Sequence, residues 1–596
     1  MPKSNPIPIL LTALAIIVIG YFCLAVQLYQ IQVQEKNQEY FTRKAKDIYT
    51  VTISDIGKRG QILDVKGSVL AGSLAFQDVY LDFRQIKESH SGDYIVQALV
   101  DIFPALHRRD LEELLVDGPR RTPRTNGERM VVSKISIDDM NRLSDHLAKL
   151  TAKRPKSERV KPKGFRFQET SRRFYPKKSL LSCIIGNVDF SDHGIAGLEK
   201  YLDKFLQPYG VSTVYERSAK GGYITDPIKV VGEKRDGYNI VLTIHEELQK
   251  IAEDEIAKAA AEWKAESIQA VMVDPKTGAI LAAAQWPAVD ANERSQIGRT
   301  PDYITQFQFE PGSMMKGLTV TIALDKAYVT LDSKFDCADS SGLYRLSDTH
   351  RLGVIPVREI VQKSSNIGTA KIALQMPPEV IYNGFKNFGL GASTGIGIPN
   401  EYPAVLKAPD RWSGPSHSRI PIGYEASVTP LQIVQAYAAI ANKGSLMQLR
   451  LIDSIRDPRD NSTLFSNPPR ELRKVAGERA IADIVSALKL VTQEGGTATK
   501  AAVPGFYVAG KTGTARKYIE GLGYSNDRFF CSFIGFVPAD RPAFVMLVTV
   551  NDPSNGKKPY YGGSVAGPIY ERIAERALQY LLVKPDFILE KKKSGR

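Results

Sequence analysis

The stretch Phe309–Lys316, with the sequence FEPGSMMK, places a helix-starting turn, a hydroxyl group and an amine close together. Pro311 and Gly312 break the preceding chain, so a helix can begin directly after them. A serine and a lysine three positions apart lie on one face of a helix, so the Lys316 amine can take the hydroxyl proton of Ser313. The helix N-terminus favours the negative charge that results. The stretch therefore predicts a nucleophilic serine at the start of a helix.

The spacing of this serine and lysine is not specific by itself. The same SxxK pattern occurs at Ser486–Lys489 and at Ser554–Lys557. A KTG triplet occurs twice, at Lys276–Gly278 and at Lys511–Gly513, whereas the SxN pattern occurs once, at Ser364–Asn366. Single short motifs of this kind are hypotheses that need structural context.

The order of the motifs along the chain distinguishes the copies. Only from Ser313 does the series SxxK, SxN, KTG run forward to a KTG triplet on a predicted strand. The KTG triplet at Lys276–Gly278 comes earlier, in a predicted hairpin turn where Thr and Gly are turn residues. We expect Ser486–Lys489 on a surface helix and Ser554–Lys557 in a loop. The chemistry is therefore assigned to Ser313 and the motifs that follow it.

With this series in place, the chain resembles the class B penicillin-binding proteins, the bacterial peptidoglycan DD-transpeptidases, over nearly its whole length. Phe309–Lys316 resembles the family's EPGSxxK, and Gly510–Ala515 resembles its GKTGTA. Val428–Gln432 resembles its VTPLQ. Upstream, Arg59–Asp64 resembles the RGxIxD box of the family's non-catalytic pedestal domain, and Gly194–Glu199 its GxxGLE.

The resemblance implies a role for each residue of the first two motifs. Ser313 is expected to attack the carbonyl of the penultimate D-alanine of a stem peptide, and Lys316 to act as general base. Ser364 is expected to relay a proton to the leaving nitrogen, and Asn366 to bind Lys316 and the substrate amide. Burial and a second cation, Lys511, are expected to lower the pKa of Lys316 so that its amine is neutral.

The residues expected to bind the substrate or a β-lactam lie in the second and third motifs: Ser365, Lys511, Thr512, Gly513 and Thr514. The substrate carboxylate is expected at Lys511, Thr512 and Thr514, and the oxyanion hole at the backbone N–H groups of Ser313 and Thr514. Gly513 allows close backbone approach. No metal or other cofactor is expected, because the seven histidines and four cysteines of the chain are widely scattered.

The expected fold class is α+β. A helix with a capping box at Thr243 and Glu246 is followed by a hairpin over 270–284, and strands are expected at 507–514, 529–537 and 543–550 before a last helix at 567–582. The resemblance implies a serine β-lactamase-like transpeptidase domain, with helices on both sides of an antiparallel sheet. Before it, short strands are expected over 49–83 and helices over 110–116 and 138–150, and the resemblance implies that these form a mixed, elongated pedestal.

An apolar segment near the N-terminus predicts one membrane span. Ile7–Leu28 has the length of a hydrocarbon core, and no charged side chain occurs between Lys3 and Glu35. Flanking charges do not decide the orientation. Peptidoglycan chemistry takes place outside the cytoplasmic membrane, so residues 1–6 are expected in the cytoplasm and the catalytic domain in the periplasm or outside the cell.

Five parts of the chain are expected from these features. They are a cytoplasmic tail at 1–6, a transmembrane anchor at 7–28, a pedestal or dimerisation-like domain at 29–235, a transpeptidase domain at 236–585 and a basic tail at 586–596.

The chain carries a net charge of +14, which indicates an anionic partner. Nucleic acid is excluded once the domain is placed outside the cytoplasm. The most basic stretch, Lys153–Arg173, is expected to be a solvated surface of the pedestal. The alternative is a specific site for lipid headgroups, the acidic cell-wall matrix or an acidic protein.

Within the family, the SSN sequence of Ser364–Asn366 is typical of the septal, cell-division type. The expected partners are stem peptides, β-lactams, the cytoplasmic membrane, a membrane glycosyltransferase and other divisome proteins. Three alternatives stay open: an elongation-type transpeptidase, a DD-carboxypeptidase, and a β-lactam-binding sensor or catalytically idle divisome scaffold.

Overall fold

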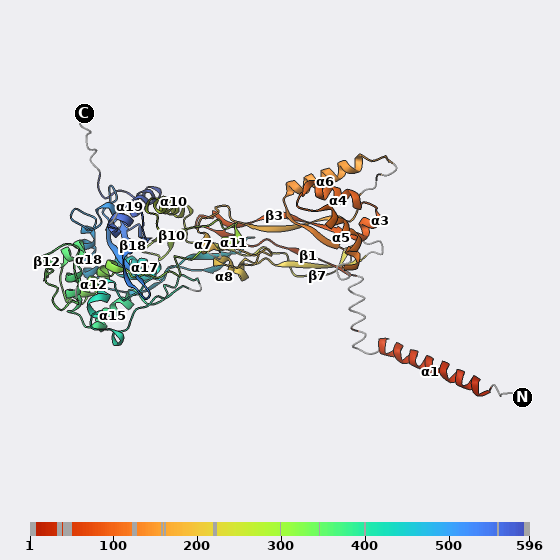
Figure 1. Ribbon diagram of the computed structural model, residues 1–596, viewed down its shortest axis with the longest axis horizontal. Coiled ribbons are helices and arrows are strands. Elements are labelled where there is room, and N and C mark those ends of the chain that lie inside the picture. Colours follow the sequence, from red (N-terminus) through yellow and green to blue (C-terminus); the bar gives the residue numbers. More distant parts are fainter. Residues whose placement is uncertain are drawn as a thin grey trace. The chain divides into compact units, whose positions relative to one another are not determined.

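The computed structural model describes residues 7–32, 39, 50–121, 128–156, 159, 162–217, 223–297, 300–344, 346–398, 401–556 and 559–588. The chain forms two compact units (Figure 1). The first unit comprises residues 1–58, 75–172 and 208–236, and the second comprises residues 59–74, 173–207 and 237–596. The predicted tail at 1–6, most of the tail at 586–596 and the strand start at Tyr49 lie outside the described residues.

The first unit begins with helix α1 (Ile7–Gln32). Its segment Leu10–Gln30 has a mean hydropathy of 2.3 and none of it is buried against the protein. By length and composition the helix can cross a membrane. An apolar helix therefore stands where the sequence predicts the anchor.

The remaining described residues of the first unit form two sheets and four helices. Its elements are β1 (Thr50–Ile56), α3 (Phe83–Glu88), α4 (Gly92–Ile102), α5 (Arg108–Arg121), β4 (Glu128–Ile135), α6 (Ile137–Ala152), β6 (Gly210–Arg217) and β7 (Tyr223–Val231). Strands β1, β6 and β7 pair in that order, all antiparallel. The later residues of β3 (Val69–Asp82) pair with β4 and with β5 (Phe165–Phe174).

Helix α6 shows why the helices of this unit form where the sequence predicts them. The Ser136 side chain caps the helix by accepting a hydrogen bond from the Asp139 backbone N–H. Leu143 and Leu147 then lie one turn apart and are buried in the core of the unit. Helices α5 and α6 confirm the helices predicted at 110–116 and 138–150.

The second unit is built on a five-stranded antiparallel sheet with the order β10-β9-β19-β18-β17. The strands are β9 (Ser267–Val273), β10 (Ile280–Trp286), β17 (Ala509–Ile519), β18 (Gly523–Val537) and β19 (Phe544–Asn551). Every residue of β9 and β19 is buried, as their nearly continuous apolar sequences require. The five strands confirm the predicted hairpin and the three predicted later strands.

Different segments cover the two faces of this sheet, as the side chains of β18 show. Phe533 packs edge-on against Tyr570 of helix α19 (Gly562–Tyr580). Phe530 contacts Phe307 and Phe309 instead. Residues an odd number apart point to opposite faces of a strand, so these contacts lie on opposite sides of the sheet. The arrangement confirms the predicted α+β class.

Helix α10 (Glu246–Trp263) packs against α19, and α17 (Pro430–Ala441) packs against β9 and β19 (Figure 1). The other helices of this unit are α7 (Ser182–Ile185), α8 (Gly197–Tyr201), α9 (Asp203–Leu206), α11 (Arg294–Ile297), α12 (Met315–Asp325), α13 (Val357–Lys363), α14 (Asn366–Ala373), α15 (Pro378–Asn387), α16 (Ser416–Arg419) and α18 (Glu478–Leu490). Short 3₁₀ turns occur at Gly312–Met314, Pro409–Arg411, Ile420–Ile422 and Thr499–Ala501.

Short strands complete the second unit. They are β2 (Ile62–Leu63), β8 (Asn239–Leu242), β11 (Lys334–Asp336), β12 (Val354–Pro356), β13 (Ser445–Met447), β14 (Ile452–Arg456), β15 (Thr463–Ser466) and β16 (Glu471–Lys474). Strands β15, β14, β8 and β2 pair in that order, and β2 also pairs with the first residues of β3. β11 pairs with β12, and β13 with β16.

The capping box predicted at Thr243 and Glu246 is wrong. Helix α10 has His245 at its N-cap, and no side chain caps it. The Thr243 hydroxyl instead lies within hydrogen-bond distance of the backbone oxygens of Ile280 and Arg450, at 2.8 and 3.0 Å. The tertiary partners of Thr243 therefore replace the local cap that its spacing to Glu246 indicates.

The two upstream motifs meet in a buried ion-pair cluster. Arg59 of the RGxIxD motif donates to Glu199 of the GxxGLE motif and to Asp203. Arg173 donates to the other carboxylate oxygen of Glu199 at 2.6 Å and is 3% exposed. The prediction that Lys153–Arg173 is a solvated surface is therefore wrong for Arg173, which is buried. The other described basic side chains of this stretch are exposed.

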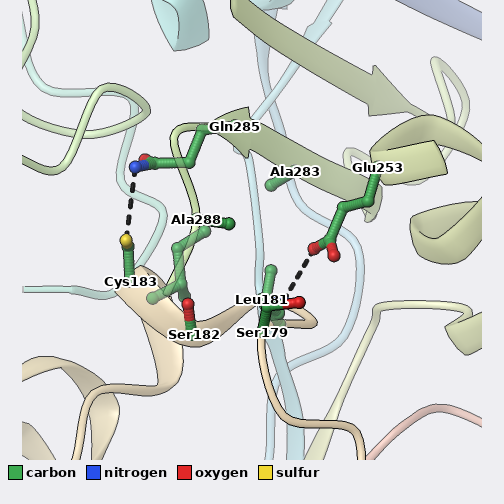
Figure 2. Close-up of a pocket in the computed structure, with 9 residues that line it drawn as sticks. Ser179, Leu181, Ser182, Cys183, Glu253, Ala283, Gln285 and Ala288 are labelled. Carbon is green, nitrogen blue, oxygen red and sulfur yellow. Dashed lines mark hydrogen bonds between the residues drawn. The ribbon is translucent and has the colours of Figure 1, made fainter. Parts of the chain in front are cut away.

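A small cavity lies between helix α10 and the segment before and within α7 (Figure 2). Its volume of about 10 Å³ is the space of one water molecule. Glu253 accepts hydrogen bonds from the backbone N–H of Leu181 and from the side chain of Gln249. The buried Ser182 hydroxyl has no partner among the described residues. Burial raises the pKa of the Glu253 carboxyl to about 7.

Candidate active site

The turn that holds Ser313 is fixed by close backbone contacts. Gly312 has a φ of +53°, and a Cβ added to it would lie 3.0 Å from the backbone oxygen of Thr514. The Gly312 N–H donates to the backbone oxygen of Gly423. Ser313 lies in the 3₁₀ turn Gly312–Met314, directly before α12. The half-buried Ser313 hydroxyl is thus presented at the first turn of a buried helix.

Lys316 lies in the first turn of α12 and is 1% exposed. Its amine donates to the side-chain oxygen of Asn366 at 2.7 Å and to the backbone oxygen of Ser364 at 2.6 Å. The hydroxyl of Ser364 lies 3.3 Å away. Burial lowers the pKa of Lys316 to about 7, so much of the population has a neutral amine near neutral pH.

Ser364 connects two buried lysines. It lies between α13 and α14 with a φ of +58°, a conformation that costs a non-glycine residue energy and is found at functional sites. The Lys511 amine lies 2.8 Å from its hydroxyl oxygen. The structure therefore places one hydroxyl between the amines of Lys316 and Lys511.

Lys511 belongs to strand β17 and is fully buried. Burial, and then the charge of Lys316, lower its pKa well below the usual range. Two ammonium groups that share one hydroxyl and are shielded from water repel each other. The fold therefore favours a state in which at most one of the two amines is charged.

The third motif runs along an edge of the central sheet. Strand β17 pairs with β18 on one side, and among the described residues no strand pairs with its other side. A Cβ on Gly513 would lie 3.0 Å from the side chain of Met314 and from the backbone oxygen of Pro311. The hydroxyl oxygens of Thr512 and Thr497 lie 3.2 Å apart, and the Thr514 hydroxyl accepts a hydrogen bond from the Gly562 N–H. The edge of β17 therefore packs closely against the turn that holds Ser313.

Ser365 faces away from the two amines. Its hydroxyl caps α14 by accepting from the Gly368 N–H, and it donates to Asp348 at 2.5 Å. The Asp348 carboxylate also accepts from the backbone N–H groups of Asn366 and Ile367. Ser365 thus holds the second motif in place, and Asp348 fixes it from an adjacent loop.

The sequence reasoning missed Asp348 and also Glu310. Glu310 accepts hydrogen bonds from the Tyr524 hydroxyl at 2.9 Å and from the Glu425 N–H at 3.0 Å. Burial raises the pKa of its carboxyl. Glu310 is the first residue of the EPGS motif, so the motif itself is a local signal for this residue. Asp348 has no local signal, because it precedes its partners by 17 to 19 residues.

The other motif copies lie apart from this cluster. Ser486 is exposed on α18, and Lys489 of that helix pairs with Asp540. Lys276–Gly278 forms a turn that Asp274 closes by hydrogen bonds. Ser554 is exposed in a loop, and Lys557 lies outside the described residues. In the described part of the chain no group of His, Cys, Asp and Glu side chains is arranged to hold a metal ion.

Two family models match the chain. Residues 268–575 match the penicillin binding protein transpeptidase domain, and residues 54–242 match the penicillin-binding protein dimerisation domain.

Curated relatives match over most of the chain. The peptidoglycan D,D-transpeptidase FtsI of Escherichia coli strain K12 is 29% identical over 550 residues, which cover 91% of this chain and 87% of that protein. The probable peptidoglycan D,D-transpeptidase PenA of Neisseria meningitidis serogroup A is 30% identical over 538 residues, which cover 88% of this chain and 85% of that protein.

Solved structures share the fold. Penicillin-binding protein 3 of Mycobacterium tuberculosis, in complex with aztreonam, superposes with a TM-score of 0.66 at 23% identity and covers 90% of this chain and 98% of its own. Penicillin-binding protein 2X of Streptococcus thermophilus gives a TM-score of 0.72 at 20% identity, covering 90% of this chain and 81% of its own.

Proposed function

The chain belongs to the class B penicillin-binding proteins and is a peptidoglycan D,D-transpeptidase, and we propose that Ser313 is the nucleophile of its reaction. The observation that carries this assignment is the hydrogen-bonded series Lys316, Ser364 and Lys511 beside the serine turn. The other two serines of SxxK patterns have no such neighbours in the described residues.

In the acylation step, the Ser313 hydroxyl attacks the carbonyl carbon of the penultimate D-alanine and loses its proton to the neutral Lys316 amine. The backbone N–H groups of Ser313 and Thr514 stabilise the oxygen that becomes negative. The proton passes through the Ser364 hydroxyl to the nitrogen of the terminal D-alanine, whose C–N bond breaks. An ester between Ser313 and the stem peptide remains, and D-alanine leaves.

In the second step, an amine of a neighbouring stem peptide attacks the ester carbonyl. The amine loses a proton to Lys316, the C–O bond to Ser313 breaks, and the serine oxygen takes up a proton. The product is an amide cross-link. A β-lactam would acylate Ser313 in the same way and remain attached.

The third motif and the second motif are proposed to hold the donor peptide. The edge of β17 that no strand pairs with in the described part of the chain can pair with an extended peptide through backbone hydrogen bonds, as edge strands do in peptide recognition. Lys511, Thr512 and Thr514 would bind the terminal carboxylate, with Gly513 allowing the approach. Asn366 would bind the substrate amide, and Ser365 would position that motif.

We also propose that the enzyme acts in septal wall synthesis. The SSN sequence at Ser364–Asn366 and the relatives named FtsI and PenA support this role. An elongation role and DD-carboxypeptidase activity are the alternatives. Product analysis with a pentapeptide donor and an acceptor amine distinguishes transpeptidation from DD-carboxypeptidase activity. A cross-linked product is expected, and hydrolysis alone would contradict transpeptidation.

The proposed placement is a single-pass protein of the cytoplasmic membrane. Residues 7–28 would form the anchor, with 1–6 in the cytoplasm, and the pedestal at 29–235 and the transpeptidase domain at 236–585 on the other side, followed by the basic tail. The apolar character of α1 supports the anchor. A membrane glycosyltransferase and other divisome proteins are the proposed partners.

The assignment of the nucleophile is tested by labelling with a fluorescent penicillin. Ser313→Ala is expected to lose all covalent label, because Ser364, which also lies at the lysine pair, is held between the two amines and is assigned to the proton relay. Ser486→Ala and Ser554→Ala are matched controls from the other SxxK patterns, and both are expected to label normally. Labelling that persists in Ser313→Ala would show that the nucleophile is another residue.

A catalytically idle divisome scaffold is distinguished by complementation. Cells with Ser313→Ala as their only copy are expected to stop dividing and to form filaments while the protein is present at normal amounts. Normal growth of these cells would favour the scaffold.

A further inference from the structure

A second cavity lies at the end of α12 away from the nucleophile. Its volume of about 380 Å³ falls within the range of small-molecule sites. The cavity is lined by the last turn of α12, one face of α15 and Val475. Lys316 and Asp325 are nine residues apart on α12, so the cavity is about 14 Å from the active-site lysine along the helix axis.

Helix α15 contributes the wall of the cavity. Val380, Asn383, Gly384 and Asn387 have helical spacing and line it together. A Cβ on Gly384 would lie 2.4 Å from the Ile322 side chain, so the glycine lets α15 approach α12 closely. Figure 1 shows the two helices next to each other. The cavity is thus built by a tight helix contact.

The charged groups at the cavity compensate each other. Asp325 accepts a hydrogen bond from the Gly477 N–H at 2.7 Å, and its other oxygen lies 3.0 Å from the Lys326 amine. The lining therefore presents a closed ion pair and no unmatched charge, which disfavours a phosphate or an ammonium ligand.

Uncharged polar groups at the rim are free to bind a ligand. Asn383 and Asn387 are exposed, and neither side-chain amide has a hydrogen-bond partner among the described residues. Each amide offers two donors and one acceptor oxygen. Tyr328, which is 38% exposed, adds a ring and a hydroxyl, and Ile322 and Val380 add an apolar surface.

We propose that this cavity binds an N-acetylated sugar unit of a glycan strand. Such a ring has an apolar C–H face, an acetamido group that pairs with amides, hydroxyl groups and no charge. The proposal rests on the proposed function, because the peptidoglycan substrate supplies the glycan. A strand held there would keep its stem peptides near Ser313 and raise their effective concentration.

The experiment uses the full chain in detergent and chitotriose, a trimer of N-acetylglucosamine, as the probe. Binding is measured by saturation-transfer NMR and by titration. The double variant Asn383→Ala/Asn387→Ala is expected to bind at least tenfold more weakly than the wild type. Lys386→Ala is the matched control on the same helix, because its side chain lies over the Tyr382 ring and does not line the cavity. It is expected to bind normally.

Penicillin labelling of every sample separates this proposal from the proposed function. Normal labelling shows that each variant is folded with an intact active site. With normal labelling, the proposal is overturned if the wild type does not bind chitotriose at millimolar concentration or if the double variant binds equally well. It is also overturned if a stem pentapeptide occupies the cavity instead. Absent labelling of the wild type would contradict the proposed function, whatever the sugar binding shows.

Discussion

The Lys316 amine can accept the Ser313 proton only when it carries no proton of its own. Burial lowers the pKa of Lys316 to about 7, so the competent form gains population as the pH rises through 7. We expect the second-order rate of acylation by a fluorescent penicillin to rise about tenfold per pH unit below pH 7 and to level off above it.

The rate is measured from time courses of covalent labelling, quenched at successive times, between pH 5.5 and pH 9. Lys489→Ala, which removes the lysine of another SxxK pattern, is expected to keep the same profile because Lys489 pairs with Asp540 away from the site. A rate that is independent of pH, or that falls as the pH rises, would rule out Lys316 as the base.

Asp348 acts on the site through the second motif. Its carboxylate accepts from the Ser365 hydroxyl and from two backbone N–H groups, and its charge raises the pKa of Lys316. Asp348→Asn is expected to slow acylation roughly 10-fold to 100-fold, because charge-assisted hydrogen bonds contribute about 1.5–3 kcal/mol. The midpoint of the pH profile is expected to move to lower pH.

The control for this variant is Asp339→Asn, which changes an exposed carboxylate of the same loop region that binds Ser341. It is expected to leave both rate and midpoint unchanged. A slower Asp348→Asn variant with an unmoved midpoint would indicate general damage to the motif and no electrostatic action on Lys316.

The sequence predicts those site residues that lie only two or three positions from another residue of the same motif. Ser313 and Lys316 are three positions apart, and Ser364 and Asn366 are two apart, so each pair can be found locally. Asp348 and the Arg173–Glu199 pair cannot, because the partners are 17 to 26 residues apart and no spacing rule applies. Arg173 stands in a basic run that is otherwise exposed, and its burial follows from tertiary packing alone.

Helix α10 and the segment that precedes α7 are joined by a buried carboxyl. In the folded protein burial raises the pKa of the Glu253 carboxyl from its ordinary value of 4.5 to about 7. The folded state therefore binds more protons at this group than the unfolded state between these values, and its stability falls as the pH rises from about 4.5 to 7.

Glu253→Gln is expected to remove this dependence. An amide keeps the oxygen that accepts from Leu181 and Gln249 and can turn its NH₂ toward the cavity (Figure 2). The free energy of unfolding of the variant, relative to that of the wild type, should increase by up to about 3 kcal/mol between pH 5 and pH 8.

Thermal unfolding at both pH values measures the effect, and Glu262→Gln on the same helix is the exposed control. An equal difference between Glu253→Gln and wild type at pH 5 and pH 8 would contradict the linkage.

The types of the principal elements follow from the sequence, whereas some helix ends do not. Helix α17 begins at a capping box between Thr429 and Gln432 with Pro430 at its first position, all local features. Helix α19 begins at Gly562, five residues before the predicted start at Gly567, and includes Pro568. Its first N–H donates to Thr514 on β17, so the end of this helix is set by a contact with a distant strand.

The proposed orientation places the catalytic unit on the side of the membrane where peptidoglycan lies. None of the apolar window in α1 is buried against the described part of the protein, which supports the proposed membrane anchor. An alkaline phosphatase fusion after Arg596 is expected to be active, because that enzyme matures outside the cytoplasm, and a fusion before Met1 is expected to be inactive.

The matched control is the double variant Leu14→Arg/Ile17→Arg in the C-terminal fusion. Each arginine costs about 2.5–3.5 kcal/mol near the centre of a membrane helix, so insertion and phosphatase activity should both fall. Activity of the N-terminal fusion would reverse the proposed orientation. An unaffected double variant that remains in the membrane fraction would show that a segment other than α1 anchors the chain, because the two charges remove the apolar continuity on which the proposed span depends.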